Sequence, residues 1–219
     1  MSRWNQTIAE TAEDARRFWS EAPVQTLYDM MDTPRWAWEE WLKVAAGVVT
    51  SPGLVFEAGC GIGLLTRFLP PGSTYYGCDI NATYVEEARR RYGRPGVRFE
   101  RRDLYDVLGS DERFDWVLIP SLFGMFPEDE SYEVIRRLWD VASRGLSVTT
   151  INERLLPKHR LMRFEFTGHD PDELAGAGRA LPGAGRVELH HGREFPRFHG
   201  HHWQRGLALY VWRTGAPSG

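Results

Sequence analysis

The sequence predicts an α/β fold, with a doubly wound, mostly parallel sheet behind a helical N-terminal segment. Short apolar runs alternate with helical patterns from residue 54 to residue 151, which is the order that βαβ units require. The run at residues 116–119 is apolar throughout, as expected for a central parallel strand. The 219 residues suffice for one such domain with a small appendage.

The first fifty residues are predicted to be helical and to precede a core at residues 51–219. Residues 7–20 carry apolar side chains at helical spacing until Pro23 interrupts the pattern. A second helix is predicted from Pro34 to about Val49, because proline is tolerated in a first helical turn. A turn at residues 51–53 separates this segment from the core.

Seven strands are predicted in the core, and helices are predicted in three of the four gaps between the first five. The strands are placed at residues 54–56, 74–79, 97–103, 116–119, 146–151, 186–190 and 207–212. The helices are placed at residues 64–69, 82–92 and 128–143, and another begins at Asp170. Asn81 has the side chain of a good N-cap for the helix at residues 82–92.

The composition limits the classes of protein to which the chain can belong. Hydrophobic residues make up 42% and charged residues 26%, which is typical of a globular chain with a buried core. The net charge of −3 disfavours a nucleic-acid enzyme with a basic face. We find no apolar run near the roughly 20 residues that span a bilayer, and no signal-peptide pattern. Two cysteines without metal-ligand spacing fit a reducing compartment, so we expect a cytoplasmic protein.

A glycine-rich loop lies between the first predicted strand and the helix after it. Gly59, Gly61 and Gly63 occupy every second position after Glu57. Glycines at such a place let the backbone turn sharply and approach a ligand, and ligands bind at the carboxyl ends of strands in a doubly wound sheet. The loop alone is a weak signal, because a similar sequence can be merely a tight turn.

Acidic residues at the next two strand ends strengthen the interpretation. Asp79 lies about 20 residues after the loop, where a carboxylate can accept both ribose hydroxyls. Asp103 ends the third strand, where it can accept from an adenine amino group. The glycine spacing differs from the nicotinamide fingerprint, and Glu57 would repel a pyrophosphate. The pattern therefore predicts a phosphate-free adenosyl ligand with a positive end.

As a set, these segments resemble the class I, Rossmann-like S-adenosylmethionine-dependent methyltransferases of the small-molecule type. Residues 57–63 look like motif I of that family, residues 77–80 like its second motif, residues 102–104 like its adenine-contacting turn and residues 114–120 like its fourth-strand motif. The resemblance implies an antiparallel last strand, a helical lid over residues 1–50 and S-adenosylmethionine as the cofactor.

The resemblance also implies roles for individual residues. Residues 59–61 would lie along the methionine part of the cofactor, Asp79 would hold the ribose, and Asp103 with Leu104 would flank the adenine. Tyr28 matches a tyrosine that helps close the lid in many small-molecule members. The expected cofactor-binding residues are Glu57, Gly59, Cys60, Gly61, Gly63, Asp79, Ile80, Asp103, Leu104, Pro120 and Tyr28.

The expected reaction is in-line methyl transfer to a nitrogen or oxygen atom of a small-molecule acceptor. The loop at residues 119–123 lacks the Asn/Asp-Pro-Pro-Tyr/Phe sequence of enzymes that methylate adenine or glutamine nitrogen, so DNA is not expected as a partner. A membrane is not expected as a partner either, and the chain is expected to be a monomer or homodimer. The expected acceptor-pocket residues are Trp36, Ser121, Phe123 and Phe126.

A general base is optional, since an amine acceptor needs only to arrive neutral. If a base acts, His199 and His201 are the leading candidates, because they would share one face of an extended loop. His159 and His169 are further candidates. No metal is expected, because a metal site needs about three ligands in a fixed geometry.

Two other functions are left open. A protein or RNA methyltransferase would need an arginine-rich surface beside the pocket, and the arginines at residues 89–91 and 101–102 are its candidates. A solvated helix face and strand edge explain the same arginines. A non-catalytic cofactor-binding or interaction module would have damaged motifs, whereas the acidic and glycine positions are intact.

Overall fold

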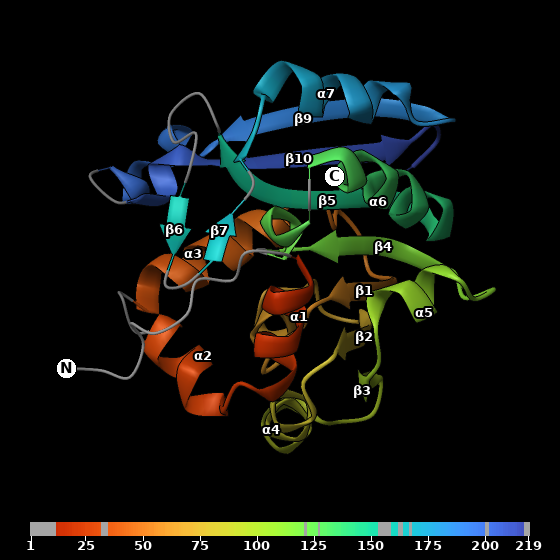
Figure 1. Cartoon of the computed structure of the whole chain (residues 1–219). Coiled ribbons are helices and arrows are strands. Elements are labelled where there is room, and N and C mark those ends of the chain that lie inside the picture. Colours follow the sequence, from red (N-terminus) through yellow and green to blue (C-terminus); the bar gives the residue numbers. More distant parts are fainter. Residues whose placement is uncertain are drawn as a thin grey trace.

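The computed structural model has one central sheet with helices on both faces (Figure 1). It describes residues 12–31, 35–120, 122–126, 128–152, 159–161, 164–166, 168–199 and 202–216. The strands are β1 (Leu54–Ala58), β2 (Thr74–Asp79), β3 (Val97–Arg101), β4 (Phe114–Ile119), β5 (Ala142–Asn152), β6 (His159–Leu161), β7 (Phe164–Phe166), β8 (Gly168–His169), β9 (Ala184–His191) and β10 (Gly206–Arg213).

Seven strands follow the order β3-β2-β1-β4-β5-β10-β9 across the main sheet. The pairs from β3 to β5 are parallel, whereas β10 runs antiparallel to both β5 and β9. The predicted doubly wound, mostly parallel sheet with an antiparallel last strand is therefore confirmed. Two features were not predicted, namely β8, which pairs with the end of β5, and a separate two-stranded sheet formed by β6 and β7.

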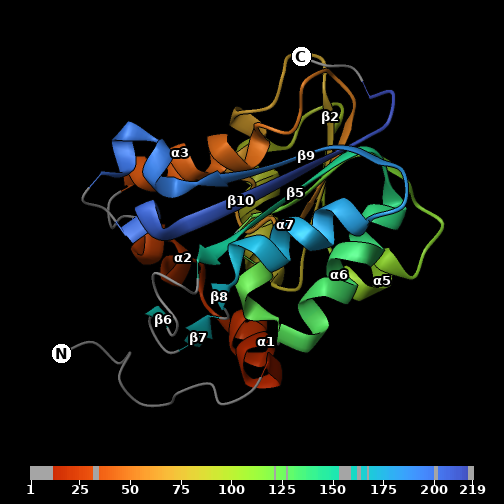
Figure 2. The same cartoon turned by 90° about the horizontal axis from the view of Figure 1, so that it is seen from above.

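Helices cover both faces of the main sheet, and an apolar cluster lies under each layer (Figure 2). The α-helices are α1 (Ala12–Glu21), α2 (Val24–Met31), α3 (Arg35–Ala46), α4 (Ala82–Tyr92), α5 (Leu104–Leu108), α6 (Glu128–Val141) and α7 (Pro171–Ala180). The short 3₁₀ helices are η2 (Leu64–Arg67), η3 (Phe123–Met125), η4 (Gly192–Glu194), η5 (Pro196–Phe198) and η6 (His202–Arg205). One cluster lies under α3 and α4, and the other under α5, α6 and α7.

Several predicted boundaries were wrong for local reasons. The third strand ends at Arg101, two residues early, because the carboxylate of Asp103 accepts from the Tyr105 N–H at 2.9 Å and caps α5. The helix expected at residues 64–69 is the 3₁₀ turn η2. The fifth strand begins at Ala142, where the sequence predicted the end of a helix. The helix α2 was not predicted, and residues 7–11 and Pro34 lie outside the described residues.

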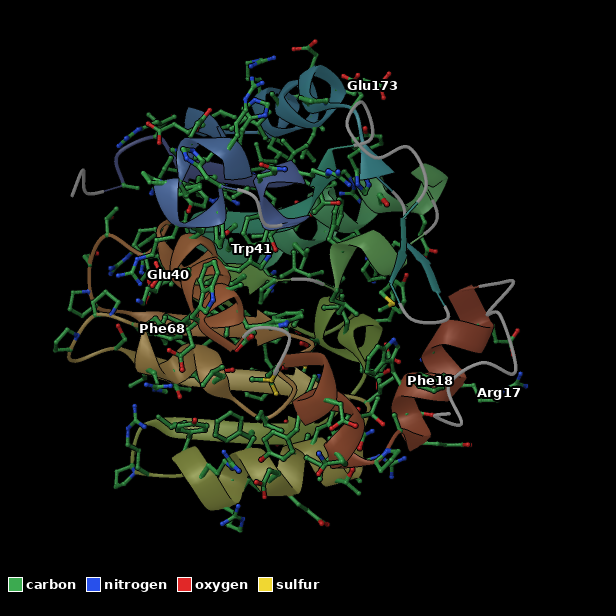
Figure 3. The ribbon with its side chains drawn as sticks, turned by 90° about the vertical axis from the view of Figure 1, so that its left-hand side faces the viewer. Arg17, Phe18, Glu40, Trp41, Phe68 and Glu173 are labelled. Carbon is green, nitrogen blue, oxygen red and sulfur yellow. The ribbon has the colours of Figure 1, made fainter. Side chains whose placement is uncertain are left out.

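The third helix, α3, packs on the sheet as part of the core. Trp41 is fully buried in the cluster beneath it (Figure 3). The Tyr210 hydroxyl of β10 donates to the Val44 carbonyl, and Trp212 Nε1 donates to the Val48 carbonyl at 3.0 Å. The Val44 carbonyl also accepts from the Gly47 N–H at 3.0 Å, so both side chains of β10 bond to carbonyls at and beyond the end of α3.

The buried Asn81 side chain joins α4 to the link between α1 and α2. Its Oδ1 accepts from the N–H groups of Thr83 at 2.9 Å and Tyr84 at 3.2 Å, so it caps α4 as predicted. Its Nδ2 donates to the carbonyls of Trp19 at 2.6 Å and Ala22 at 2.8 Å. One amide therefore holds the N-terminal helices against the helix that follows β2.

Substitutions at Asn81 should separate these two roles. Asn81→Ser keeps a capping oxygen but loses both donors to the α1–α2 link, whereas Asn81→Ala loses the cap as well. We expect faster amide exchange in α1 and α2 for both variants, and about 1 kcal/mol less unfolding free energy for alanine than for serine. Hydrogen exchange and urea unfolding measure these effects. If the backbone amides of α1 exchanged in Asn81→Ser at the wild-type rate, this role of the Asn81 side chain would be contradicted.

Candidate active site

A cavity of about 630 Å³ opens at the carboxyl ends of the first four strands. Its walls include the loop after β1, the ends of β2 and β3, and the loop after β4. It therefore lies where the strand order reverses between β1 and β4, the usual ligand site of an open α/β sheet. Its volume falls in the range of about 300–1,000 Å³ that is typical of small-molecule sites.

The glycine-rich loop forms the floor of the cavity. Gly59 and Gly61 have φ values of +69° and +50°, which side chains of L-residues rarely adopt. A Cβ at Gly59 would lie 2.9 Å from the Leu122 side chain, and one at Gly61 would lie 3.1 Å from Leu27. The glycines therefore let the loop approach both α2 and the loop after β4, and leave its backbone open toward a ligand.

Glu57 lies at the end of β1 and is only 3% exposed. The Tyr75 hydroxyl donates to its Oε2. Burial raises the pKa of Glu57 to about 8, the hydrogen bond from Tyr75 opposes this shift, and the charge of Asp79 adds to it. A carboxyl with a raised pKa in a cleft is a candidate functional group.

Asp79 lies at the end of β2 and lines the same cavity. Its two oxygens accept from the backbone N–H groups of Gly61 and Asn81, each at 2.9 Å. Burial nevertheless raises the pKa of Asp79 to about 6. No lysine or arginine among the described residues forms an ion pair with Glu57 or Asp79. This end of the cavity therefore favours a ligand that carries positive charge and hydroxyl donors.

Asp103 is the third acidic residue at the strand ends, and unlike Glu57 and Asp79 it has a cationic partner. Its Oδ2 pairs with the guanidinium of Arg16, which reaches across from α1. Its Oδ1 caps α5 through the Tyr105 N–H. Asp103 therefore joins the N-terminal helices to the turn after β3 at the wall of the cavity.

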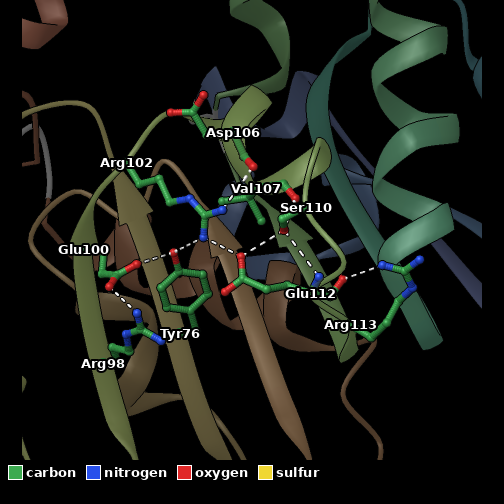
Figure 4. Close-up of polar contacts among 9 residues, drawn as sticks. All are labelled: Tyr76, Arg98, Glu100, Arg102, Asp106, Val107, Ser110, Glu112 and Arg113. Carbon is green, nitrogen blue, oxygen red and sulfur yellow. Dashed lines mark hydrogen bonds and ion pairs between the residues drawn. The ribbon is translucent and has the colours of Figure 1, made fainter.

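Arg102 also lines the cavity, and its side-chain contacts hold the turn after β3 in place (Figure 4). Its guanidinium pairs with Glu112, donates to the Tyr76 hydroxyl at 3.3 Å and donates to the Asp106 carbonyl at 3.0 Å. These contacts connect β2, α5 and the loop before β4. This role of Arg102 could not be predicted from the sequence, because none of its three partners is adjacent to it in the chain.

The structure places most predicted cofactor residues around one space. Nine of them line the cavity, namely Glu57, Gly59, Cys60, Gly61, Asp79, Ile80, Asp103, Leu104 and Pro120. Gly63 is not part of the described cavity wall, and a Cβ there would come within 2.6 Å of the Phe99 ring. The Tyr28 hydroxyl donates to Glu87 of α4 at 2.5 Å, and its ring lies beneath the Arg91 guanidinium.

The predicted acceptor residues are more dispersed. Phe126 lines the cavity. Phe123 is fully buried and stacks on the His169 ring at 4.6 Å, beneath the cavity wall. Ser121 lies outside the described residues. The loop after β4 contributes Leu122 and Met125 to the wall, and neither was singled out from the sequence.

The tryptophans of α3 diverge, as their spacing predicted. Trp36 is 42% exposed and stacks on Phe198 at 6.5 Å. Trp41 lies in the core, and Trp38 lines the cavity. The sequence named Trp36 for the pocket, whereas the helix turns Trp38 toward it.

Two of the candidate general bases can be located in the structure. The exposed His199 places Nε2 3.2 Å from the Arg193 carbonyl, and the ring is not part of the described cavity wall. His201 and the side chain of His159 lie outside the described residues. The catalytic role of His199 and His201 therefore stays a prediction.

His169 is buried at the end of β8. Its Nδ1 lies 2.8 Å from the Thr150 hydroxyl, and burial lowers the pKa of its imidazole to about 4. The ring is therefore neutral near pH 7. Like His199, it does not belong to the described wall of the cavity.

The arginines that could have formed a basic patch are bonded within the chain. All five of them, at residues 89–91 and 101–102, donate to acceptors of the protein itself. These acceptors include the Phe99 and Ile80 carbonyls and the carboxylates of Glu87 and Glu112. These five arginines fit the predicted solvated helix face and strand edge.

In the described part of the chain, histidines, cysteines and acidic residues form no group of three or more that could hold a metal ion. The helices of this part include none with the length and apolar character needed to cross a membrane.

Comparison with known proteins agrees with this geometry. Residues 55–145 match a family model described as a methyltransferase domain. The phthiotriol/phenolphthiotriol dimycocerosates methyltransferase of Mycobacterium tuberculosis is 36% identical over 90 residues, which are 38% of this chain and 33% of that protein. The fatty-acid O-methyltransferase of Mycolicibacterium smegmatis is 34% identical over 90 residues, which are 38% of this chain and 32% of that protein. The chain spans about a third of the length of the curated relatives it matches.

Solved structures resemble nearly the whole chain. The magnesium protoporphyrin IX methyltransferase from Synechocystis PCC 6803 superposes with a TM-score of 0.66 at 18% identity, covering 93% of this chain and 97% of that one. The 1,6-didemethyltoxoflavin-N1-methyltransferase of Burkholderia thailandensis gives 0.65 at 19% identity, covering 96% and 93%. At these identities the likeness shows the fold.

The matched domain and the shared fold agree with each other. Residues 55–145 match a methyltransferase domain, and the chain as a whole has the Rossmann-like fold of the solved methyltransferases.

The raised pKa of Glu57 predicts a pH dependence of stability. The ordinary value is 4.5 and the folded value about 8, so between these limits the folded chain keeps a proton that the unfolded chain has released. The free energy of unfolding should therefore fall as pH rises, by up to about 1.4 kcal/mol per pH unit. Asp79 acts in the same direction, but only up to about pH 6.

Urea unfolding of wild type and Glu57→Gln between pH 6 and pH 8 measures this effect. The difference in unfolding free energy between the two proteins should change across this range, because only wild type has the Glu57 carboxyl. His169 and Asp79 are present in both proteins, so their contributions cancel. Glu86→Gln, on the exposed face of α4, is the matched control. Parallel curves for wild type and Glu57→Gln would show that the carboxyl is already ionised at pH 6.

Proposed function

We propose that this protein transfers the methyl group of S-adenosylmethionine to an oxygen or nitrogen atom of a small molecule with an extended apolar part. The observation that carries the proposal is the convergence of the glycine-rich loop, Glu57, Asp79 and Asp103 on one cavity whose remaining wall is largely apolar. The first group of residues suits the cofactor, and the apolar wall suits the acceptor.

The acidic end fits the cofactor by charge and by hydrogen bonding. Glu57 and Asp79 are carboxyls without a cationic partner among the described residues, and S-adenosylmethionine has a sulfonium, an ammonium and two ribose hydroxyls to offer. In this proposal Asp79 accepts from the ribose, and Asp103 with Leu104 flanks the adenine. The open backbone of residues 59–61 lies along the methionine part.

The other walls suit an apolar acceptor. Glu13 of α1 and Glu130 of α6 also line the cavity, but the residues from α2, α3 and the loop after β4 all have apolar side chains. They are Leu27, Met31, Trp38, Leu42, Leu122, Met125 and Phe126. The relative named as a fatty-acid O-methyltransferase acts on molecules with long apolar chains, which supports the same acceptor class. Burial of such a chain would contribute about 25 cal/mol per Å² of apolar surface.

When bound, S-adenosylmethionine supplies the electrophilic methyl group, and the chain contributes position and exclusion of water. Binding both molecules in one cavity aligns the attacking atom with the methyl carbon, which can supply several kcal/mol. A carboxylate or neutral amine attacks without prior loss of a proton, so no general base is needed for such acceptors.

The N-terminal segment, predicted as a lid over residues 1–50, is proposed to close the site through α1 and α2. The contacts that support this role are the Asn81 bonds to Trp19 and Ala22 and the pairing of Arg16 with Asp103. The helix α3 packs in the core and is proposed to belong to the methyltransferase domain rather than to the lid.

Asp79→Ala tests the cofactor end of the site. Loss of the charge-assisted bonds to the ribose should weaken S-adenosylmethionine binding by about 1–3 kcal/mol, or 5- to 150-fold. Calorimetric titration measures this change, and Glu86→Ala is the control because its side chain is exposed on α4, away from the cavity. Unchanged affinity in Asp79→Ala would mean that the ribose binds elsewhere, and a wild-type protein that binds no cofactor at millimolar concentration would refute the proposed function.

A second test concerns the acceptor. Methyl-labelled S-adenosylmethionine is supplied with pairs of acids, alcohols and amines that share a reactive group but differ in the length of an alkyl chain. Labelled product should form from the long-chain members, and Phe126→Ala should raise their KM roughly 10-fold while leaving the Kd of the cofactor unchanged. Equal turnover of short and long members would contradict an apolar acceptor.

A further inference from the structure

The hydroxyl of Tyr84 is a buried polar group with no described partner. Tyr84 lies in the first turn of α4, just after β2, and is only 3% exposed. Tyr84 is one of the residues that line the cavity. No described group accepts from or donates to the hydroxyl. Buried hydroxyls are nearly always hydrogen-bonded in folded proteins, so an unpaired one at a ligand cavity calls for an explanation.

The neighbouring tyrosines show how the chain treats such groups elsewhere. Tyr75 donates to Glu57, Tyr76 to Glu100 and Tyr105 to Glu130, so each of these hydroxyls has a carboxylate of the protein as its partner. Tyr84 also has a carboxylate nearby, because the charge of Asp79 raises the pKa of its phenol together with burial. Yet no hydrogen bond joins the two groups, and the oxygens of Asp79 already accept from backbone N–H groups.

The backbone holds Tyr84 close to Asp79. The Tyr84 N–H donates to Asn81, the cap residue that directly follows the loop after Asp79. Tyr84 and Asp79 are thus held at opposite ends of one tight strand-to-helix turn and line the same cavity. Because the hydroxyl itself is buried, a small movement of the ring would bring it to a ligand group bound at Asp79.

We propose that Tyr84 is a cofactor-binding residue whose hydroxyl donates a hydrogen bond to a ribose oxygen of the ligand held by Asp79. This inference rests on the proposed function, since it takes the ligand to be an adenosyl compound. A ribose hydroxyl suits the position because it can donate to the carboxylate and still accept from the phenol. The raised pKa of the phenol keeps it protonated, and hence a donor, at physiological pH.

The test is Tyr84→Phe, which removes one oxygen and keeps the ring. Titration calorimetry with S-adenosylhomocysteine should show binding 5- to 20-fold weaker than in wild type. Thermal unfolding without ligand should be unchanged or shifted upward, because the substitution removes an unsatisfied buried hydroxyl. Tyr92→Phe, at the other end of α4 and outside the described cavity wall, should leave both measurements unchanged.

The 2′-deoxy and 3′-deoxy forms of S-adenosylhomocysteine identify the contacted atom. Wild type should lose affinity for both analogues, and Tyr84→Phe should lose less than wild type for the analogue that lacks the contacted oxygen. Equal affinity of wild type and Tyr84→Phe for S-adenosylhomocysteine would overturn the inference while leaving the proposed function intact. So would additive losses with both analogues, or a fall in affinity matched by a fall in unfolding temperature. If wild type itself bound no S-adenosylhomocysteine, the proposed function would fail first.

Discussion

The parallel pairing of β1 with β2 and β4 decides where the chemistry of this protein lies. Ala58 pairs with Cys78, Glu57 pairs with Leu118, and Asp79 pairs with Arg101 at the end of β3. Because parallel strands end at the same edge of a sheet, these registers bring three acidic strand ends and one glycine-rich loop to a single cavity. A shift of one residue in any register would turn one of the carboxylates to the opposite face.

That convergence has a cost in stability. Two carboxyls, Glu57 and Asp79, are held out of water without a cation, and their raised pKa values express the penalty. The chain offsets part of it with donors of its own, namely the Tyr75 hydroxyl and the N–H groups of Gly61 and Asn81. Sites built for ligands commonly trade stability in this way.

The sequence predicted the features that depend on local chemistry. The strand at residues 74–79, the helix at residues 82–92 and the Asn81 cap were all predicted with correct bounds, because alternation, helical spacing and a capping side chain lie within a few residues. It could not predict which tryptophan of α3 faces the cavity, since that depends on how the helix is rotated on the sheet. Nor could it predict the roles of Arg102 and Tyr84. Both depend on whether a polar group finds a partner far along the chain, which only the packed structure determines.

The amide of Asn81 uses both of its halves, with its oxygen on α4 and its nitrogen on the α1–α2 link. Aspartate offers no donor, and serine has one hydroxyl for what the amide does with two separate atoms. Leucine has a similar volume but no hydrogen-bonding group. Position 81 is therefore closed to conservative exchange by geometry alone. This restriction comes from joining two parts of the chain, so it does not depend on which ligand the cavity binds.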